Sequence, residues 1–475
     1  MANVNRPVLV RIVCLLAMAA VLWSCGSGGY GSSNPPPTPP PPAQLKLDLI
    51  VTGLSVVKIQ ASASTGTVVL EERLTSLTQA GPDRSLVILD LRGTETGRCA
   101  APPGFAMIDF AQHPSGEISL VLATATAVRI TRVDRSCTVL FELALDDPQA
   151  ANDPFFDTGG LHDDHSLLPV FTRDAVRVAP IGESLAVALR SGRNATVAYR
   201  LDRAGAGYAR AWRTLVEPGV SVFLIGITSG SYDEFHALEN HMQLRIDADT
   251  SGNIVVGVPS KFQSAPIFAA HSAFFGEPIA AQDGALITRL SPGGTRIGTT
   301  VIDTRRPSEM HGLRIAGDDI AIVGRVFSEQ RSDGSGWDAW SARVSRADGS
   351  LASYRPLDVE QGEILFDIGS FRDGKFIAVG AAGYTQNPTG ASVSEASTPL
   401  LVILESDGRL AARIPFTPGI PFPVFARQNQ VRTLAAVGDT WLIGGLANGP
   451  GTHSGDADPR LIAADGYARE LTIPN

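Results

Sequence analysis

The chain has 475 residues, 44% of them hydrophobic and 18% charged, which is enough apolar material to bury a large core. The formal net charge is −9 at pH 7, and the sequence contains no basic stripe. Nucleic-acid binding requires positive charge along the phosphate backbone, so we expect no nucleic-acid partner.

The N-terminus has the pattern of an export signal. Arg6 and Arg11 form a positively charged start, and residues 12–23 form an apolar run. This run is too short for a mature membrane-spanning helix, which needs about 20 residues. It ends in the sequence LWSC, residues 22–25, which resembles the lipobox of bacterial lipoproteins.

The resemblance implies that residues 1–24 are a signal peptide that is removed and that the Cys25 thiol carries a lipid. The rest of the chain would then be exported and anchored to a membrane. Gly26 stands where an aspartate favours the inner membrane in such lipoproteins, so the resemblance implies the outer membrane or the cell surface. A plain secretory signal with an unmodified Cys25 is the alternative.

Residues 25–44 are rich in glycine, serine and proline. Glycine and serine give a flexible coil, and the proline tract gives a stiffer polyproline II spacer. We therefore expect a lipidated tether over residues 25–44 that holds a single domain, residues 45–475, away from the membrane.

Residues 45–475 repeat a pattern of two β-hairpins. In the first hairpin, two apolar runs flank a tight polar turn and the second run ends in glycine. Examples are RIAGDDIAIVG (314–324), IDADTSGNIVVG (246–257) and FDIGSFRDGKFIAVG (366–380). A second hairpin follows, as in WSARVSRADGSLASY (340–354). Apolar and β-branched runs around Gly-Asp or Asp-Gly turns are typical of such hairpins.

Four-stranded units that repeat along a whole chain predict an all-β fold, a β-propeller rather than a sandwich. The copy at 244–257, LRIDADTSGNIVVG, resembles the repeat of secreted bacterial β-propellers. That resemblance implies a fold and a scaffold role without defined catalytic residues. We expect seven four-stranded blades, with six or eight as alternatives. A hairpin at 85–98 implies an early blade, and a strand at 47–52 would join the last hairpin and close the ring.

Cys99 and Cys137 are the two cysteines left in the exported domain, because Cys14 leaves with the signal and Cys25 is the lipid site. An oxidising compartment favours a disulfide between them. Two separate buried thiols are the alternative. Two cysteines are too few for a zinc–thiolate site.

Candidate metal ligands gather in two long insertions and at the start of a later repeat. They are imidazole and carboxylate side chains, which suit Zn, Mn or Fe. The set consists of Asp157, His162, Asp163 and His165 in residues 152–169, His236 and His241 in residues 230–241, and His311.

Convergence of His165, His241 and His311 at the mouth of the central channel would support metal-assisted hydrolysis. Solvated loops are the alternative. The sequence contains no H-E-x-x-H, G-x-S-x-G or P-loop motif, which weakens the hydrolase and nucleotide-enzyme hypotheses.

Asp247, Asp249 and Ser251 form the opening of a calcium-type loop, but Val258 stands where the acidic closing residue would be. A plain hairpin turn is the alternative. Trp337 and Trp340 lie in a loop-like segment. They would either contact a sugar or peptide or pack at a blade edge.

Two functional hypotheses follow. In the first, the chain is a binding or scaffold protein for an envelope protein or polysaccharide. It is tethered to a membrane by lipid and needs no cofactor. In the second, it is a propeller hydrolase or lyase with a divalent metal bound by histidine and aspartate at the channel mouth.

Overall fold

The computed structural model describes residues 47–73, 83–124, 127–145, 176–190, 196–217, 244–261, 283–306, 308–327, 336–360, 362–383, 397–417, 428–449, 465–471 and 473. All of them lie in one compact unit, Ala43–Asn475. They form antiparallel strands and one short 3-10 helix, η3 (Arg372–Gly374), among the residues described.

Seven four-stranded sheets make up this unit, and six of them take their strands in chain order. The first three are β2 (Ser55–Ser62), β3 (Gly66–Arg73), β4 (Asp83–Leu89) and β5 (Glu95–Ala100); β6 (Ala106–Gln112), β7 (Ile118–Ala123), β8 (Val128–Val133) and β9 (Val139–Ala144); and β10 (Val176–Ile181), β11 (Ser184–Arg190), β12 (Thr196–Ala204) and β13 (Gly207–Glu217).

The next three sheets follow the same order. They are β14 (Arg245–Ala248), β15 (Ile254–Lys261), β16 (Asp283–Leu290) and β17 (Arg296–Asp303); β18 (Ser308–Ala316), β19 (Asp319–Phe327), β20 (Trp337–Ser345) and β21 (Leu351–Leu357); and β22 (Ile364–Ser370), β23 (Phe376–Ala382), β24 (Thr398–Leu404) and β25 (Leu410–Arg413).

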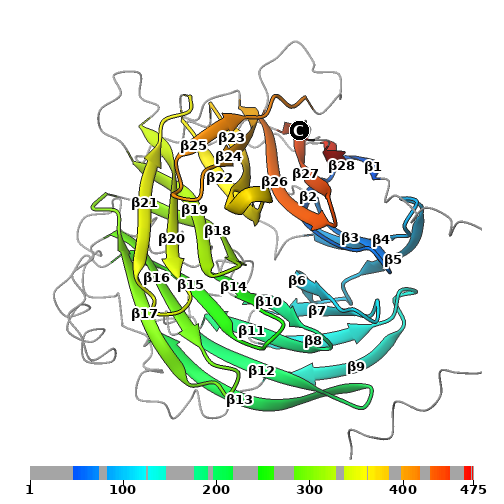
Figure 1. Ribbon diagram of the computed structural model, residues 1–475. Coiled ribbons are helices and arrows are strands. Elements are labelled where there is room, and N and C mark those ends of the chain that lie inside the picture. Colours follow the sequence, from blue (N-terminus) through cyan, green and yellow to red (C-terminus); the bar gives the residue numbers. More distant parts are fainter. Residues whose placement is uncertain are drawn as a thin grey trace, which may run out of the picture. The chain divides into compact units, whose positions relative to one another are not determined.

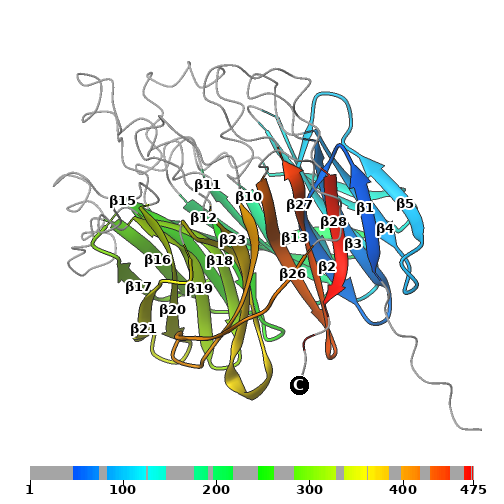
Figure 2. The ribbon, with the colours of Figure 1, turned by 90° about the horizontal axis from the view of Figure 1, so that it is seen from above.

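The seventh sheet joins the two ends of the domain. Its strand order is β1 (Asp48–Thr52), β28 (Asp465–Leu471), β27 (Thr440–Gly449) and β26 (Gln428–Val437). Figure 2 shows β28 between β1 and β27. The N-terminal strand therefore completes the last blade, as expected from residues 47–52, and the prediction of a seven-bladed β-propeller is confirmed.

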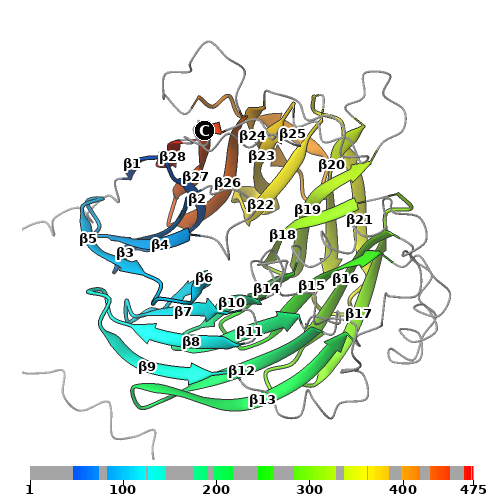
Figure 3. The same ribbon diagram turned by 180° about the vertical axis from the view of Figure 1, so that it is seen from behind.

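One edge strand of every sheet lies at the centre of the ring, namely the first strand in chain order in six sheets and β26 in the seventh (Figures 1 and 3). Each of these strands contacts the corresponding strand of the next sheet, and β26 contacts β2 to complete the circle. We call these seven strands, β2, β6, β10, β14, β18, β22 and β26, the inner strands.

The core lies between neighbouring blades. One buried cluster combines Ile108 and Val121 of the second blade with Val178 and Val187 of the third. Because the middle strands of a blade are covered on both faces, they are apolar without alternation, as in the fully buried β7. The outermost strands are more exposed, as in β9. Ring closure leaves each blade with two covered faces.

The connections between strands are short at one end of the blades and mostly longer at the other end. The first and second strands, and likewise the third and fourth, are joined by tight turns such as Gly182-Glu183 and 134–138. The other connections run from second to third strands and from blade to blade, at the opposite ends. Every interstrand stretch outside the described residues belongs to this second kind, including 146–175 and 218–243.

Candidate functional site

Among the predicted metal ligands, His311 is the one that the described residues include. It lies on the inner strand β18, where its side chain is 16% exposed. Its Nε2 atom lies 2.8 Å from Oε2 of Glu309, and its ring packs edge-on against Phe366. Glu309 also binds the Arg325 guanidinium through two contacts, one of them 2.6 Å from Nε. The carboxylate thus fixes the orientation of the imidazole.

Burial and the neighbouring charges determine the charge states of His311 and Glu309. Burial lowers the pKa of His311 below its usual value, although Glu309 acts in the opposite direction. Burial disfavours the Glu309 carboxylate, but Arg325 and His311 outweigh it and hold the pKa of Glu309 well below its usual range. His311 is therefore a neutral, oriented imidazole beside an ionised carboxylate, an arrangement that suits a proton acceptor or a metal ligand.

The other predicted ligands, Asp157, His162, Asp163, His165, His236 and His241, lie outside the described residues. Both segments that carry them connect one blade to the next, so they attach to the same ends of the strands at which β18 begins. Within the described residues, no three His, Cys, Asp or Glu side chains gather as a metal site. Convergence on His311 stays a prediction.

The predicted calcium residues have other partners in the structure. An Asp247 carboxylate oxygen accepts a hydrogen bond of 2.7 Å from the backbone N–H of Ile315. Asp249 accepts bonds from the backbone and side-chain amides of Asn253 across its hairpin turn and forms an ion pair with Arg346. Ser251 is exposed at the turn. Asp247 thus binds the neighbouring strand β18, whereas Asp249 binds within its own hairpin turn and to Arg346.

Trp337 and Trp340 are both buried, at 4% and 0% exposure, in strand β20. The Trp340 indole N–H lies 2.9 Å from the carbonyl oxygen of Arg325, and the Arg325 guanidinium lies 4.3 Å from the centre of the Trp337 ring. Both tryptophans pack inside the blade, so a surface that contacts a sugar or peptide is not formed by them.

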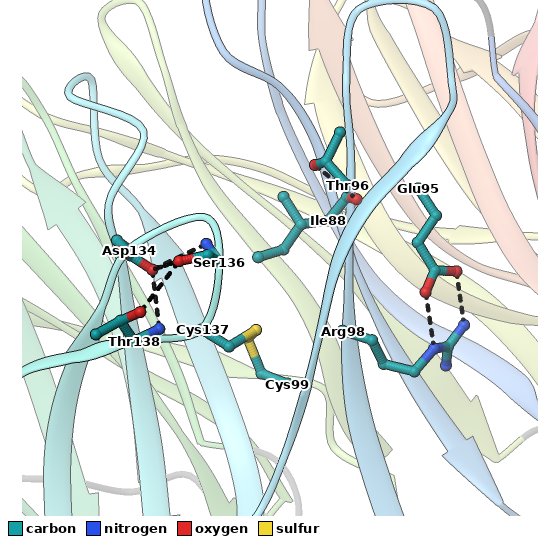
Figure 4. Close-up of a disulfide and its surroundings, with 9 residues drawn as sticks. All are labelled: Ile88, Glu95, Thr96, Arg98, Cys99, Asp134, Ser136, Cys137 and Thr138. Carbon is teal, nitrogen blue, oxygen red and sulfur yellow. Dashed lines mark hydrogen bonds and ion pairs between the residues drawn. A yellow bond between two sulfur atoms is a disulfide. The ribbon is translucent and has the colours of Figure 1, made fainter.

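Cys99 and Cys137 form a disulfide, with their Cα atoms 5.4 Å apart, which confirms the predicted pair (Figure 4). Cys99 belongs to the outermost strand of the first blade, and Cys137 to the turn between β8 and β9 of the second. The bond therefore ties two blades together. In the turn, the Asp134 carboxylate accepts hydrogen bonds from the backbone of Ser136 and Thr138.

A buried polar cluster joins the second and third blades and was not anticipated from the sequence. The Nδ1 atom of His113 lies 2.9 Å from the carbonyl oxygen of Gly182 and must donate to it. The Nε2 atom lies 2.8 Å from the hydroxyls of both Ser119 and Tyr208. Arg132 donates to the Tyr208 hydroxyl over 2.8 Å. His113 is 1% exposed, so this cluster stabilises the blade interface rather than forming an open site.

The inner strands also carry charged side chains that the sequence analysis did not single out. They are Lys58, Asp109, Arg177, Arg314 and Asp367, together with Asp247. The available signal was a single charged residue inside the mostly apolar strands β2, β6, β10 and β22, but only the closed ring shows that these residues meet.

No helix among the described residues has the length and apolar character needed to cross a bilayer. No protein-family model matches the chain, and no curated protein matches it.

Solved structures show similarity to the chain, and two of them illustrate it. One is a protein of unknown function from Bacteroides caccae, with 8% identity and a TM-score of 0.37 over 82% of this chain and 98% of that chain. The other is the β-propeller domain of the Trilobed protease from Pyrococcus furiosus, which has an open velcro topology, with 12% identity and a TM-score of 0.40 over 90% of this chain and 99% of that chain. The fold assignment rests on the strand pairing of this chain. A β-propeller supports a binding or scaffold role in general terms, and the partner must be argued from its surface.

Proposed function

We propose that this chain is an exported lipoprotein whose β-propeller binds or scaffolds an envelope protein or polymer. The observation that carries the proposal is the difference between the two ends of the strands. Tight turns close one face of the ring, whereas the long segments 146–175 and 218–243 enter at the other. Binding residues in rigid folds concentrate in such connecting segments. We call the face of the long connections the loop face.

Lipid attachment is tested by substitution of the two N-terminal cysteines. Metabolic labelling with an alkyne-palmitate should mark the wild-type chain and a Cys14→Ala variant, because Cys14 lies in the segment that is removed. A Cys25→Ala variant should carry no label and should leave the membrane fraction. Label retained by Cys25→Ala, or lost from Cys14→Ala, would contradict the proposed anchor.

Binding through the loop face is tested by photo-crosslinking from two exposed positions. Arg306 lies between β17 and β18 at the loop face, and Asp439 lies in the turn between β26 and β27 at the opposite face. A photoreactive amino acid at position 306 should give a discrete envelope adduct in cells, and the same residue at position 439 should give none. Adducts from position 439 alone would place the binding surface on the other face.

The second candidate function, a metal-dependent hydrolase or lyase, is favoured by the neutral imidazole of His311 beside Glu309. Elemental mass spectrometry of the Cys25→Ala protein after dialysis without chelator distinguishes the two functions. Stoichiometric Zn, Mn or Fe that is lost in a His311→Gln variant would establish the metal site. Metal that is unaffected by His311→Gln would remove this residue from the candidate site.

A further inference from the structure

Seven side chains, one from each inner strand, form a circle around the centre of the ring. In ring order they are Lys58 (β2), Asp109 (β6), Arg177 (β10), Asp247 (β14), Arg314 (β18), Asp367 (β22) and Thr433 (β26). Their charges alternate around the ring. Each of the three bases is followed by an acid, and the seventh position holds a neutral threonine. We call this set the charge belt.

Each acid of the belt binds the backbone of the next inner strand. A carboxylate oxygen of Asp109 accepts the N–H of Val178 at 3.0 Å, and Asp247 accepts the N–H of Ile315 at 2.7 Å. Asp367 accepts the N–H of Leu434 at 3.1 Å. In all three cases the donor lies one residue after the belt member of that next strand. The three contacts are therefore one repeated junction.

Two of the three bases, Lys58 and Arg314, reach forward to the acid of the next strand. The Lys58 ammonium lies 2.6 Å from Oδ1 of Asp109 and 2.8 Å from the carbonyl oxygen of Phe110. The Arg314 guanidinium lies 3.4 Å from Oδ2 of Asp367. Asp109 and Asp367 are thus each contacted by a base from one neighbouring strand and by a backbone N–H from the other.

Thr433 is the uncharged member that an odd number of belt positions requires. Seven members cannot alternate perfectly in a closed ring, because an odd number would place two like charges side by side. The Thr433 hydroxyl donates to Oδ2 of Asp367 at 3.5 Å and accepts the N–H of Ile59 at 3.2 Å. Ile59 again lies one residue after the belt member Lys58. The neutral hydroxyl therefore makes the same junction as an acid without adding a charge.

The bases of the belt favour the ionised form of the neighbouring acids, against the effect of burial. Burial raises the pKa of Asp247, against the effect of Arg314. Burial also works against the ionised form of Asp109, yet Lys58 and Arg177 together keep its pKa below the usual value. Charges held this close, with side chains such as Asp109 at 4% exposure, interact strongly because little water screens them.

We propose that the charge belt acts as one unit that closes the propeller in a single register, and that the alternation around the whole circle, with its neutral member, is what stabilises closure. Antiparallel pairing of β1 with β28 closes the ring at its outer edge, and the belt would close it at the centre. The competing explanation is a set of independent local contacts, each contributing on its own.

Moving the neutral residue from position 433 to position 58 distinguishes a cooperative belt from independent local contacts. Thr433→Lys sets two positive charges side by side, at 433 and 58, and should lower the thermal unfolding midpoint. Lys58→Thr alone removes the base beside Asp109 and should also lower it. The double variant Thr433→Lys with Lys58→Thr restores alternation, with the neutral residue at 58. Its midpoint should lie above both single variants and recover at least half of the Thr433→Lys loss.

A composition-matched control uses a lysine outside the belt. Lys375 pairs with Glu405 near the surface, with a side-chain exposure of 34%. Lys375→Thr should not rescue Thr433→Lys, although it makes the same chemical change as Lys58→Thr.

Additive losses in the Thr433→Lys, Lys58→Thr double variant would overturn the proposal that the belt acts as one unit. If Thr433→Lys alone gives no folded protein, recovery of folded protein with Lys58→Thr and not with Lys375→Thr supports it, and recovery with neither overturns it.

Discussion

At the residue scale, His113 shows how burial and hydrogen bonding select one protonation state. Burial lowers its pKa from 6.5 to about 4, and the Arg132 guanidinium acts in the same direction. The unfolded chain therefore binds more protons than the folded one between these values, and stability falls as the pH falls through this window. We expect this residue alone to remove roughly 3 kcal/mol of the free energy of unfolding between pH 6.5 and 4.

The measurement is urea unfolding of the wild type and a His113→Asn variant across this pH range. At pH 7 the variant should be less stable by about 1–3 kcal/mol, because Ser119 and Tyr208 lose a buried partner. The gap between the two proteins should narrow toward pH 4, since only the wild type loses stability through this group. Taking the difference cancels the other titrating residues. A gap that stays constant would show that His113 titrates normally.

At the scale of an element, several hairpin turns share one backbone geometry. In five of them a residue at positive φ donates its N–H three positions back: Gly93, Gly116, Gly252, Gly294 and Gly408. The turn between β8 and β9 makes the same bond, but Cys137 takes the glycine place at φ 66°. A non-glycine residue at positive φ is strained. Cys137 therefore adopts an unfavourable backbone conformation at the position from which it bonds to Cys99.

Two predictions about this turn share one set of variants. Cys99→Ser with Cys137→Ser should be about 2–4 kcal/mol less stable than the oxidised wild type, because it frees a closed loop in the unfolded chain. Cys99→Ser with Cys137→Gly should recover about 1 kcal/mol of that loss, because glycine adopts positive φ freely. Urea unfolding with and without reductant measures both. Equal stability of the serine and glycine variants would show that the turn bears no strain, and a reductant effect on either variant would be inconsistent with a disulfide role.

At the scale of the whole molecule, the fold was predictable and the belt was not. The blades are visible in the sequence because their signals are local: apolar runs around tight turns, as in residues 314–324 and 366–380. Ring closure by residues 47–52 was expected because this strand could join the last hairpin and so connect the two ends of the domain. The pairing of Asp109 with Lys58 and Val178 joins residues that are neighbours only in the closed ring. Glu309 and His311 lie two positions apart in β18, but Arg325, which holds the Glu309 carboxylate, lies on the neighbouring strand.

Closure by β1 has a direct test. A chain that begins at Gly53 lacks the strand that pairs with β28 from Asp48↔Arg469 to Thr52↔Asp465. It also lacks the buried Leu47 side chain, whose burial stabilises the fold by about 1.5–3 kcal/mol. We expect a lower thermal unfolding midpoint than for a chain that begins at Leu45.

A synthetic peptide of residues 45–53 added to the shortened chain should raise the midpoint progressively as its concentration increases, because it binds only the folded ring. A peptide with the same composition in scrambled order is the control. If the shortened chain already unfolds at the midpoint of the longer one, β1 contributes nothing to closure. The contacts of β2 with β26, β27 and β28 would then hold the ring. If the midpoint falls and only the native peptide restores it, the outer pairing of β1 with β28 is part of the closure, in addition to any contribution from the centre.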